Sequence, residues 1–319
     1  MLVCTVWRNI LTHPTFVPRY RAFHRTPPLL GLIVNTVEDE ESVAIFLPTT
    51  RIRPPLTEAR RCRVLDCRHG RVLLFREDVG RLLVWNPLTG QNRLLPAPAQ
   101  SQGLEDSNAA VFCAAGTDCD HLSCGRGHFL VAMASVKDDR VHAWLFSSET
   151  GEWSARASMD APDEVFGLHV DQPPTLSGDS VFFQCEYSKV LMYCTFDASL
   201  MFVDIPFMED SCGLAEIRLL PEVGDGLFRL ASLYHDTLTL WSIDEVDAAW
   251  KKANVLKLPD LLPFPIAAPA ILGGVADLGN CIFFFGSDGI VTSMDITSFE
   301  TTEVCRMDDP VFIFGYRQH

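Results

Sequence analysis

The hydrophobic positions of residues 64–98 fall into short runs that predict antiparallel β-strands in series. Polar segments separate three apolar and aromatic runs, which lie at 64–65, 72–75 and 82–85. After the third run, Asn86, Pro87 and Gly90 combine an Asx side chain, a φ-fixed residue and a φ-permissive residue, which favours a tight reversal over a helix. A further strand is expected at 91–95. About 35 residues therefore encode three or four strands, close to the ~40–50 residues of one β-propeller blade.

The same strand, turn and return strand recur four more times along the chain. The turn positions are Asn86, Ser148, Asp197, Asp244 and Asp295, with spacings of 62, 49, 47 and 51 residues. An inner pair of apolar runs precedes each later hairpin, at 109–114 with 129–134, Leu168 with 181–185, 217–220 with 227–234, and 271–272 with 281–285. Repetition at this spacing predicts propeller blades joined by loops of different length.

One hairpin, at 29–47, remains outside these five repeats. It makes a sixth blade if the last apolar run, 311–316, pairs with it and closes the ring, because closure removes the exposed sheet edges. We therefore predict an all-β fold: a single β-propeller of six four-stranded blades over residues 27–319, with five or seven blades as alternatives. A short helical segment over residues 1–26 is expected to precede it.

That first segment has helical periodicity. Its apolar residues recur at i, i+3, i+4, i+7 and i+8, as Val3, Val6, Trp7, Ile10 and Leu11. The stripe predicts an amphipathic helix that ends before Pro14 and packs on the propeller.

Charge and cysteine content limit the partners and the compartment. The chain has 26 Lys and Arg against 41 Asp and Glu, a net charge of −15. Nucleic acid and anionic membranes are therefore not expected as partners, because the chain has no excess of cations to neutralise phosphates. Eleven cysteines show no disulfide rhythm, which favours a reducing intracellular compartment, cytoplasmic or nuclear. The sequence has no good signal peptide and no apolar run long enough to span a membrane.

The chain carries one cluster of residues that could bind a metal. Cys119, His121, Cys124 and His128 follow a C-x-H-x2-C-x3-H order, and Cys113 lies just before them. Cysteine and histidine are zinc ligands. Structural zinc sites, however, favour two ligand pairs of the C-x2–4-C type with a longer gap between the pairs. The alternative is a glycine-rich hairpin loop with cysteines as small apolar residues. We expect no bound metal or cofactor, and keep these four residues as the candidate ligands.

Catalytic motifs are missing from the sequence. It contains no nucleophile elbow, zinc-protease motif or phosphate loop. His69, which follows Asp66 closely, is better interpreted as a turn residue than as a base. The five arginines at 51, 53, 60, 61 and 63 form the most basic stretch, and they more often balance nearby acids than face a partner. We expect a non-catalytic protein, with a propeller enzyme or lectin as the alternative.

Residues 2–24 resemble the C-terminal part of an F-box. The matching positions are Val3, Cys4, Trp7, Arg8, His13, Pro14, Phe16, Arg19, Tyr20, Arg21 and Phe23. The resemblance does not include the first half of the motif, which in the family opens with Leu-Pro-x-x-Leu-Leu. It implies an N-terminally truncated F-box, either a gene model that begins late or a degenerate relative. In this resemblance, Val3, Val6, Trp7 and Ile10 would be apolar anchors for a Skp-type adaptor.

The runs 67–74, 84–90 and 94–96 look like the F-box-associated, kelch-related β-propeller of plant F-box proteins. The resemblance implies a substrate-receptor subunit of an SCF-type (Skp-cullin-F-box) ubiquitin ligase that recognises an unidentified protein substrate through propeller loops. A free-standing interaction domain without a ligase role is the alternative.

Overall fold

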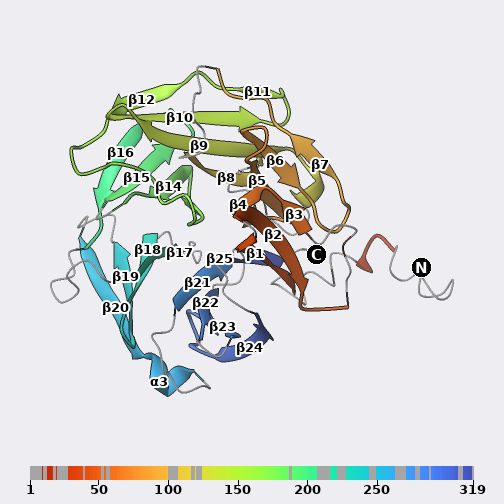
Figure 1. Ribbon diagram of the computed structural model, residues 1–319, viewed down its shortest axis with the longest axis vertical. Coiled ribbons are helices and arrows are strands. Elements are labelled where there is room, and N and C mark those ends of the chain that lie inside the picture. Colours follow the sequence, from red (N-terminus) through yellow and green to blue (C-terminus); the bar gives the residue numbers. More distant parts are fainter. Residues whose placement is uncertain are drawn as a thin grey trace.

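The computed structural model describes residues 9, 13–16, 19, 28–38, 40–51, 54, 58–99, 107–115, 119, 124–186, 189–206, 216–220, 228–243, 249–262, 271–276, 281–286, 289–307 and 312–317. Almost all the regular elements among these residues are β-strands, and Figure 1 shows their sheets arranged in a ring. The predicted adaptor anchors Val3, Val6, Trp7 and Ile10 lie outside the described residues.

The ring has six blades, and the first three are formed as follows. Blade 1 contains β25 (Phe312–Arg317), β1 (Leu29–Glu38), β2 (Glu41–Pro48) and β3 (Glu58–Arg60). Blade 2 contains β4 (Cys62–Arg68), β5 (Arg71–Arg76), β6 (Arg81–Trp85) and β7 (Asn92–Leu94). Blade 3 contains β8 (Ser107–Cys113), β9 (Phe129–Lys137), β10 (Arg140–Ser147), β11 (Glu152–Trp153) and β12 (Ala157–Asp160).

The other three blades have four strands each. Blade 4 contains β13 (Thr175–Ser177), β14 (Ser180–Gln184), β15 (Lys189–Cys194) and β16 (Leu200–Asp204). Blade 5 contains β17 (Glu216–Leu220), β18 (Phe228–Tyr234), β19 (Thr237–Ile243) and β20 (Trp250–Lys257). Blade 6 contains β21 (Ile271–Ala276), β22 (Cys281–Phe285), β23 (Ile290–Asp295) and β24 (Thr301–Arg306). Two short helices, η3 (Cys124–Arg126) and α3 (Leu258–Leu261), are also described.

The last strand closes the ring, as the sequence predicts. β25 pairs antiparallel with β1, with Leu32 opposite Gly315 and Val34 opposite Ile313. The buried Tyr316 at the end of β25 donates its hydroxyl hydrogen to the carbonyl oxygen of Gly70 in blade 2, at 3.2 Å. Strands from both ends of the chain therefore share one blade (Figure 1), and this blade has no open inner edge.

The turns between outer strands use the predicted Asx chemistry. The side-chain oxygen of Asn86 accepts hydrogen bonds from the amides of Leu88 and Thr89, at 3.1 and 3.2 Å. Gly90 completes this turn at a φ of 71°, which favours glycine. Asp295 organises the corresponding turn of blade 6 by accepting from the amides two and three residues ahead. The turn predicted at Asp244 lies outside the described residues.

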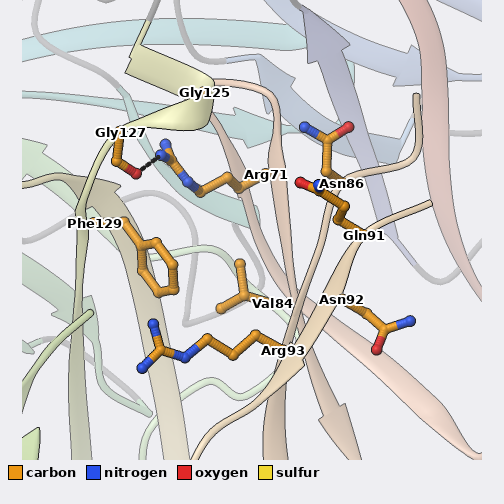
Figure 2. A pocket seen from close by; sticks show the side chains of 9 residues that line it. All are labelled: Arg71, Val84, Asn86, Gln91, Asn92, Arg93, Gly125, Gly127 and Phe129. Carbon is orange, nitrogen blue, oxygen red and sulfur yellow. Dashed lines mark hydrogen bonds between the residues drawn. The ribbon is translucent and has the colours of Figure 1, made fainter. Parts of the chain in front are cut away.

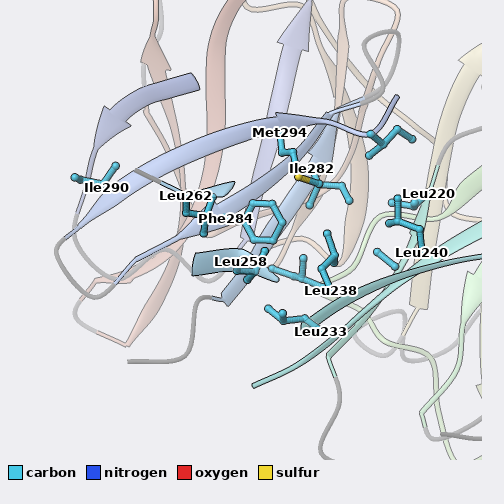
Figure 3. Close-up of a cluster of buried hydrophobic side chains, with 13 residues drawn as sticks. Leu220, Leu233, Leu238, Leu240, Leu258, Leu262, Ile282, Phe284, Ile290 and Met294 are labelled. Atoms are coloured by element: carbon cyan, nitrogen blue, oxygen red, sulfur yellow. The ribbon is translucent and has the colours of Figure 1, made fainter. Parts of the chain in front are cut away.

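The hydrophobic core is divided among the spaces between blades. Each of six buried clusters combines side chains from two neighbouring blades, and Figure 3 shows the cluster between blades 5 and 6. Because neighbouring blades cover both faces of a middle strand, such a strand is apolar without alternation, as in β5. The outermost β7 is exposed along its whole length.

Two details differ from the predicted repeat. In blade 4 the innermost strand is β13, whereas Leu168 forms an isolated bridge with Cys185. In blade 3 the outer position is shared by β11 and β12, which both pair with β10. Over the part of the chain that the structure describes, no helix is long and apolar enough to cross a membrane.

Candidate functional site

A pocket of about 340 Å³ opens between blades 2 and 3, beside the Asn86 turn and η3 (Figure 2). The lining residues come from β5, β6, β7 and the Asn86 turn of blade 2, from the connection between β8 and β9, and from the start of β9. They are Arg71, Val84, Asn86, Gln91, Asn92, Arg93, Gly125, Gly127 and Phe129. Two arginines and three amide side chains line this pocket, and no carboxylate is among these nine residues. The site is locally basic on a chain whose net charge is −15.

Arg71 forms the inner wall of the pocket. It begins β5, and only 4% of the residue is exposed. Its Nη2 donates to the carbonyl oxygen of Cys124 at 2.6 Å and to that of Gly127 at 2.7 Å, and Figure 2 shows the second of these bonds. Burial lowers the pKa of Arg71, while nearby thiols oppose that shift. Arginine stays charged at neutral pH despite such a shift, so the wall of the pocket is cationic.

Arg93 forms the outer wall. It lies on the exposed strand β7, and its Nη1 donates to the carbonyl oxygen of Ser148 at 3.0 Å. The guanidinium carbon of Arg93 is 5.9 Å from the centre of the Phe129 ring, and that of Arg71 is 5.3 Å from the same ring. Figure 2 shows the ring between the two guanidinium groups. Cation–π contacts with the Phe129 ring help to hold both arginines in place.

Such a pocket suits a carboxylate or another compact anion. Guanidinium groups form strong, charge-assisted hydrogen bonds with carboxylates, and the neighbouring amides of Gln91 and Asn92 add neutral donors. The sequence offered no direct sign of this site, because Arg71, Arg93 and Phe129 belong to three different strands in two blades.

Three cysteine side chains lie close together next to the pocket. The sulfur atoms of Cys113, Cys119 and Cys124 all lie within 4.8 Å of one another. Cys113 ends β8 and Cys124 begins η3, and both are buried, while Cys119 is partly exposed. Burial, reinforced by the other two thiols, raises the pKa of Cys124 to about 12. The connection between β8 and β9 thus folds back so that its two ends meet.

The predicted metal ligands are only partly brought together. Cys119 and Cys124 are in the group of three, and their third member is Cys113. His128 is exposed and does not belong to that group. His121 lies outside the described residues.

The centre of the ring contains a buried polar network that sequence reasoning missed. Both carboxylate oxygens of Asp66 accept from Nε of Arg68 at 3.0 Å, and one also accepts from the amide of Val111 at 2.9 Å. Arg68 reaches further and donates to the carbonyl oxygen of Pro174. Asp66 therefore links blades 2 and 3. His69 occupies a turn with a φ of 51°.

The network continues through blades 4, 5 and 6. Asn108 donates to the carbonyl oxygens of His169 and Gln172, at 2.8 and 2.6 Å. Arg218 donates to the carbonyl oxygen of Leu272 at 3.0 Å, and the amide of Leu272 donates to Glu216 at 2.8 Å. These residues lie on inner strands or in the segment before β13. Their hydrogen bonds join successive blades, which is a structural role.

Two arginines of the basic stretch at 51–63 pair with nearby acids, whereas Nη1 of Arg63 lies 3.8 Å from a carboxylate oxygen of Asp171, in the segment before β13. Arg60 pairs with Glu38 at 2.9 Å and Arg61 pairs with Glu41 at 2.6 Å, on the surface of blade 1. Such exposed pairs contribute little to stability.

Comparisons with known proteins bear on the fold alone. No protein-family model and no curated protein sequence matches this chain. Among solved structures, a protein from Lactobacillus plantarum matches with a TM-score of 0.50 at 14% identity, over 90% of this chain and 85% of that protein. TolB from Acinetobacter baumannii matches with a TM-score of 0.43 at 13% identity, over 94% of this chain and 59% of TolB.

A chain of the mitotic checkpoint complex has a TM-score of 0.41 at 13% identity, and the match covers 76% of this chain and 64% of that one. This chain therefore spans less than two thirds of the checkpoint and TolB chains. The sheet order and the ring closure define the fold as a six-bladed β-propeller.

Proposed function

We propose that this protein is a non-catalytic interaction module that binds an acidic segment of a partner protein in the pocket between blades 2 and 3. The observation that carries the proposal is the pair of guanidinium groups on either side of Phe129, at 5.3 and 5.9 Å from its ring. A carboxylate of the partner would bind the exposed Arg93, with the charge of Arg71 on the other side of the ring adding attraction, and apolar atoms of the same segment would contact the ring.

The rigidity of the ring supports this role. The arginines are attached to strands whose blades pack through a shared core, and both donate to carbonyl oxygens of blade 3 or of its connection. A site held in this way loses little conformational entropy on binding. Arg93 is exposed and Arg71 is buried, so a ligand meets Arg93 first.

A peptide array tests the proposal. Peptides that contain Asp or Glu are compared with otherwise identical peptides that contain Asn or Gln, and the selected acidic peptide is then titrated in solution. Arg93→Gln is expected to weaken its binding about tenfold, the loss of one charge-assisted contact. Arg156→Gln, an equal charge change on an exposed residue of blade 3 outside the pocket, is the control. Equal binding by acidic and amide peptides would contradict the proposal.

We further propose that the module is the substrate receptor of an SCF-type ubiquitin ligase. The support is the F-box-like sequence of residues 2–24, with Val3, Val6, Trp7 and Ile10 as adaptor anchors. Coprecipitation with a purified Skp-type adaptor tests this step. Trp7→Ala should abolish adaptor binding, and Arg93→Gln should leave it intact. Acidic-peptide binding without adaptor binding would instead favour a free-standing interaction domain.

A further inference from the structure

The three thiols behind the pocket have the spacing of a metal site. In tetrahedral zinc–thiolate sites each Zn–S bond is about 2.3 Å, which places the sulfur atoms about 3.8 Å apart. The sulfur atoms of Cys113, Cys119 and Cys124 lie within 4.8 Å of one another, so a shift of about 1 Å or less brings them to that distance. Three sulfur ligands leave one tetrahedral position for a fourth donor.

The buried charge of Arg71 is a second, independent observation that favours a metal site at these thiols. The Nη1 atom of this residue is buried and finds no oxygen or nitrogen acceptor among the described residues. As thiolates, Cys124, Cys113 and Cys119 would stabilise the charge of Arg71, and no ion pair with a carboxylate is found for it among the described residues. A buried cation without a counter-charge is strongly unfavourable. Protonated thiols leave Arg71 in that state.

We propose that Cys113, Cys119 and Cys124 bind one Zn²⁺ ion as thiolates, and that Arg71 balances the charge of this centre. Three thiolates and one divalent cation carry a net charge of −1, which the guanidinium cancels. Binding releases the three thiol protons to solvent, and no oxidation is involved. A disulfide between two of the cysteines would leave a neutral centre and an uncompensated Arg71.

The centre would also support the pocket. Cys124 begins η3, and the carbonyl oxygens of Cys124 and Gly127 accept the two hydrogen bonds from Arg71. Gly125 and Gly127 line the pocket. A zinc ion would therefore hold the wall of the pocket to the end of β8.

Metal analysis of the full chain, purified in reductant and washed with a weak chelator, is the first test. About one zinc per chain is expected for the wild type. Cys119→Ser, at the partly exposed position, should reduce the zinc content at least fivefold. Cys194→Ser is the matched control, a partly exposed cysteine of blade 4 outside the cluster, and should retain the metal.

Cobalt titration of the metal-free wild type is the second test, and its result does not depend on whether a variant folds. Thiolate-to-cobalt charge-transfer absorption and the visible bands of a tetrahedral Co²⁺ site are expected, and one equivalent of Zn²⁺ should remove both. A missing charge-transfer band, zinc retained by Cys119→Ser, or a disulfide within the trio in protein purified with reductant would overturn the proposal. None of these readouts depends on acidic-peptide binding.

Discussion

The Nη2 atom of Arg71 donates to the carbonyl oxygen of Cys124 at 2.6 Å and so joins blade 2 to the β8–β9 connection. The same atom reaches the carbonyl oxygen of Gly127 at 2.7 Å. The two acceptors belong to a single turn, because the amide of Gly127 donates to the oxygen of Cys124 at 2.8 Å. One guanidinium group therefore organises the turn that forms part of the pocket wall.

Replacing Arg71 should destabilise the fold. Arg71→Met fills much of the same space but removes the guanidinium donor from both carbonyl oxygens, of which that of Cys124 keeps the amide of Gly127. The expected loss is about 2–3 kcal/mol of unfolding free energy. Urea denaturation measures it. Arg156→Met, an exposed position of blade 3, should change the unfolding free energy by less than about 0.5 kcal/mol. A loss at Arg71 no larger than at Arg156 would refute this account of the turn.

Breaking the buried ion pair of Asp66 and Arg68 should lower the unfolding free energy more than replacing Arg71 does. Asp66→Asn leaves the Arg68 charge buried without its carboxylate, and breaking such a pair costs about 3–5 kcal/mol. The measurement is again urea denaturation. Asp78→Asn breaks the more exposed pair of Asp78 with Arg76 and serves as the control, and its expected cost is much smaller than that of Asp66→Asn. Similar costs for both variants would show that Asp66 does not link the blades.

The repeat architecture could be predicted from sequence because each turn carries its own chemical signal. Asn86 and Asp295 are short polar residues at the end of an apolar strand, and in the structure each side chain accepts from the amides ahead of it. Such signals depend on residues close in sequence. Closure by β25 could be predicted as well, because one apolar run and one hairpin remained without partners.

The pocket and the polar centre could not be predicted in the same way. Arg93 and Phe129 meet because blades 2 and 3 pack together, and a sequence pattern does not state which surface residues face each other across that interface. The thiol group is an intermediate case. The Cys/His cluster is visible in the sequence, but the return of η3 to the end of β8 decides that Cys113 meets Cys124.

Alkaline pH should destabilise the folded chain in part through Cys62. Burial raises the pKa of this thiol from 9.0 to about 11. The folded state then holds the proton more tightly than the unfolded chain does. The contribution of this thiol to stability is therefore complete below about pH 9 and is lost as the pH rises through about 11.

Two measurements check the role of Cys62. Urea denaturation between pH 8 and pH 11 should show a smaller decrease in unfolding free energy for Cys62→Ala than for the wild type. Alkylation of Cys62 in the folded chain, followed by mass spectrometry, should be negligible at about pH 9, where the thiol of the urea-unfolded chain already reacts. Equal labelling of the two states at that pH would contradict the raised pKa.

Gly274 lies at the junction between blades 6 and 1. It lies opposite Ile313 where β21 runs parallel to β25. A Cβ atom at this position would be 1.7 Å from the backbone oxygen of Ile313, a distance that no side-chain rotation can relieve. Gly274→Ala should therefore push the two inner strands apart at the junction that closes the ring, with an expected loss of more than about 3 kcal/mol.

Gly80→Ala separates this steric effect from backbone strain. Gly80 has a φ of +60°, and a Cβ atom there meets nothing within 4 Å, so this variant should cost about 1 kcal/mol from the left-handed conformation alone. Urea denaturation compares the two. A Gly274→Ala variant as stable as Gly80→Ala would mean that blades 6 and 1 are farther apart than the parallel pairing requires. The larger loss would establish that this pairing helps hold the ring closed.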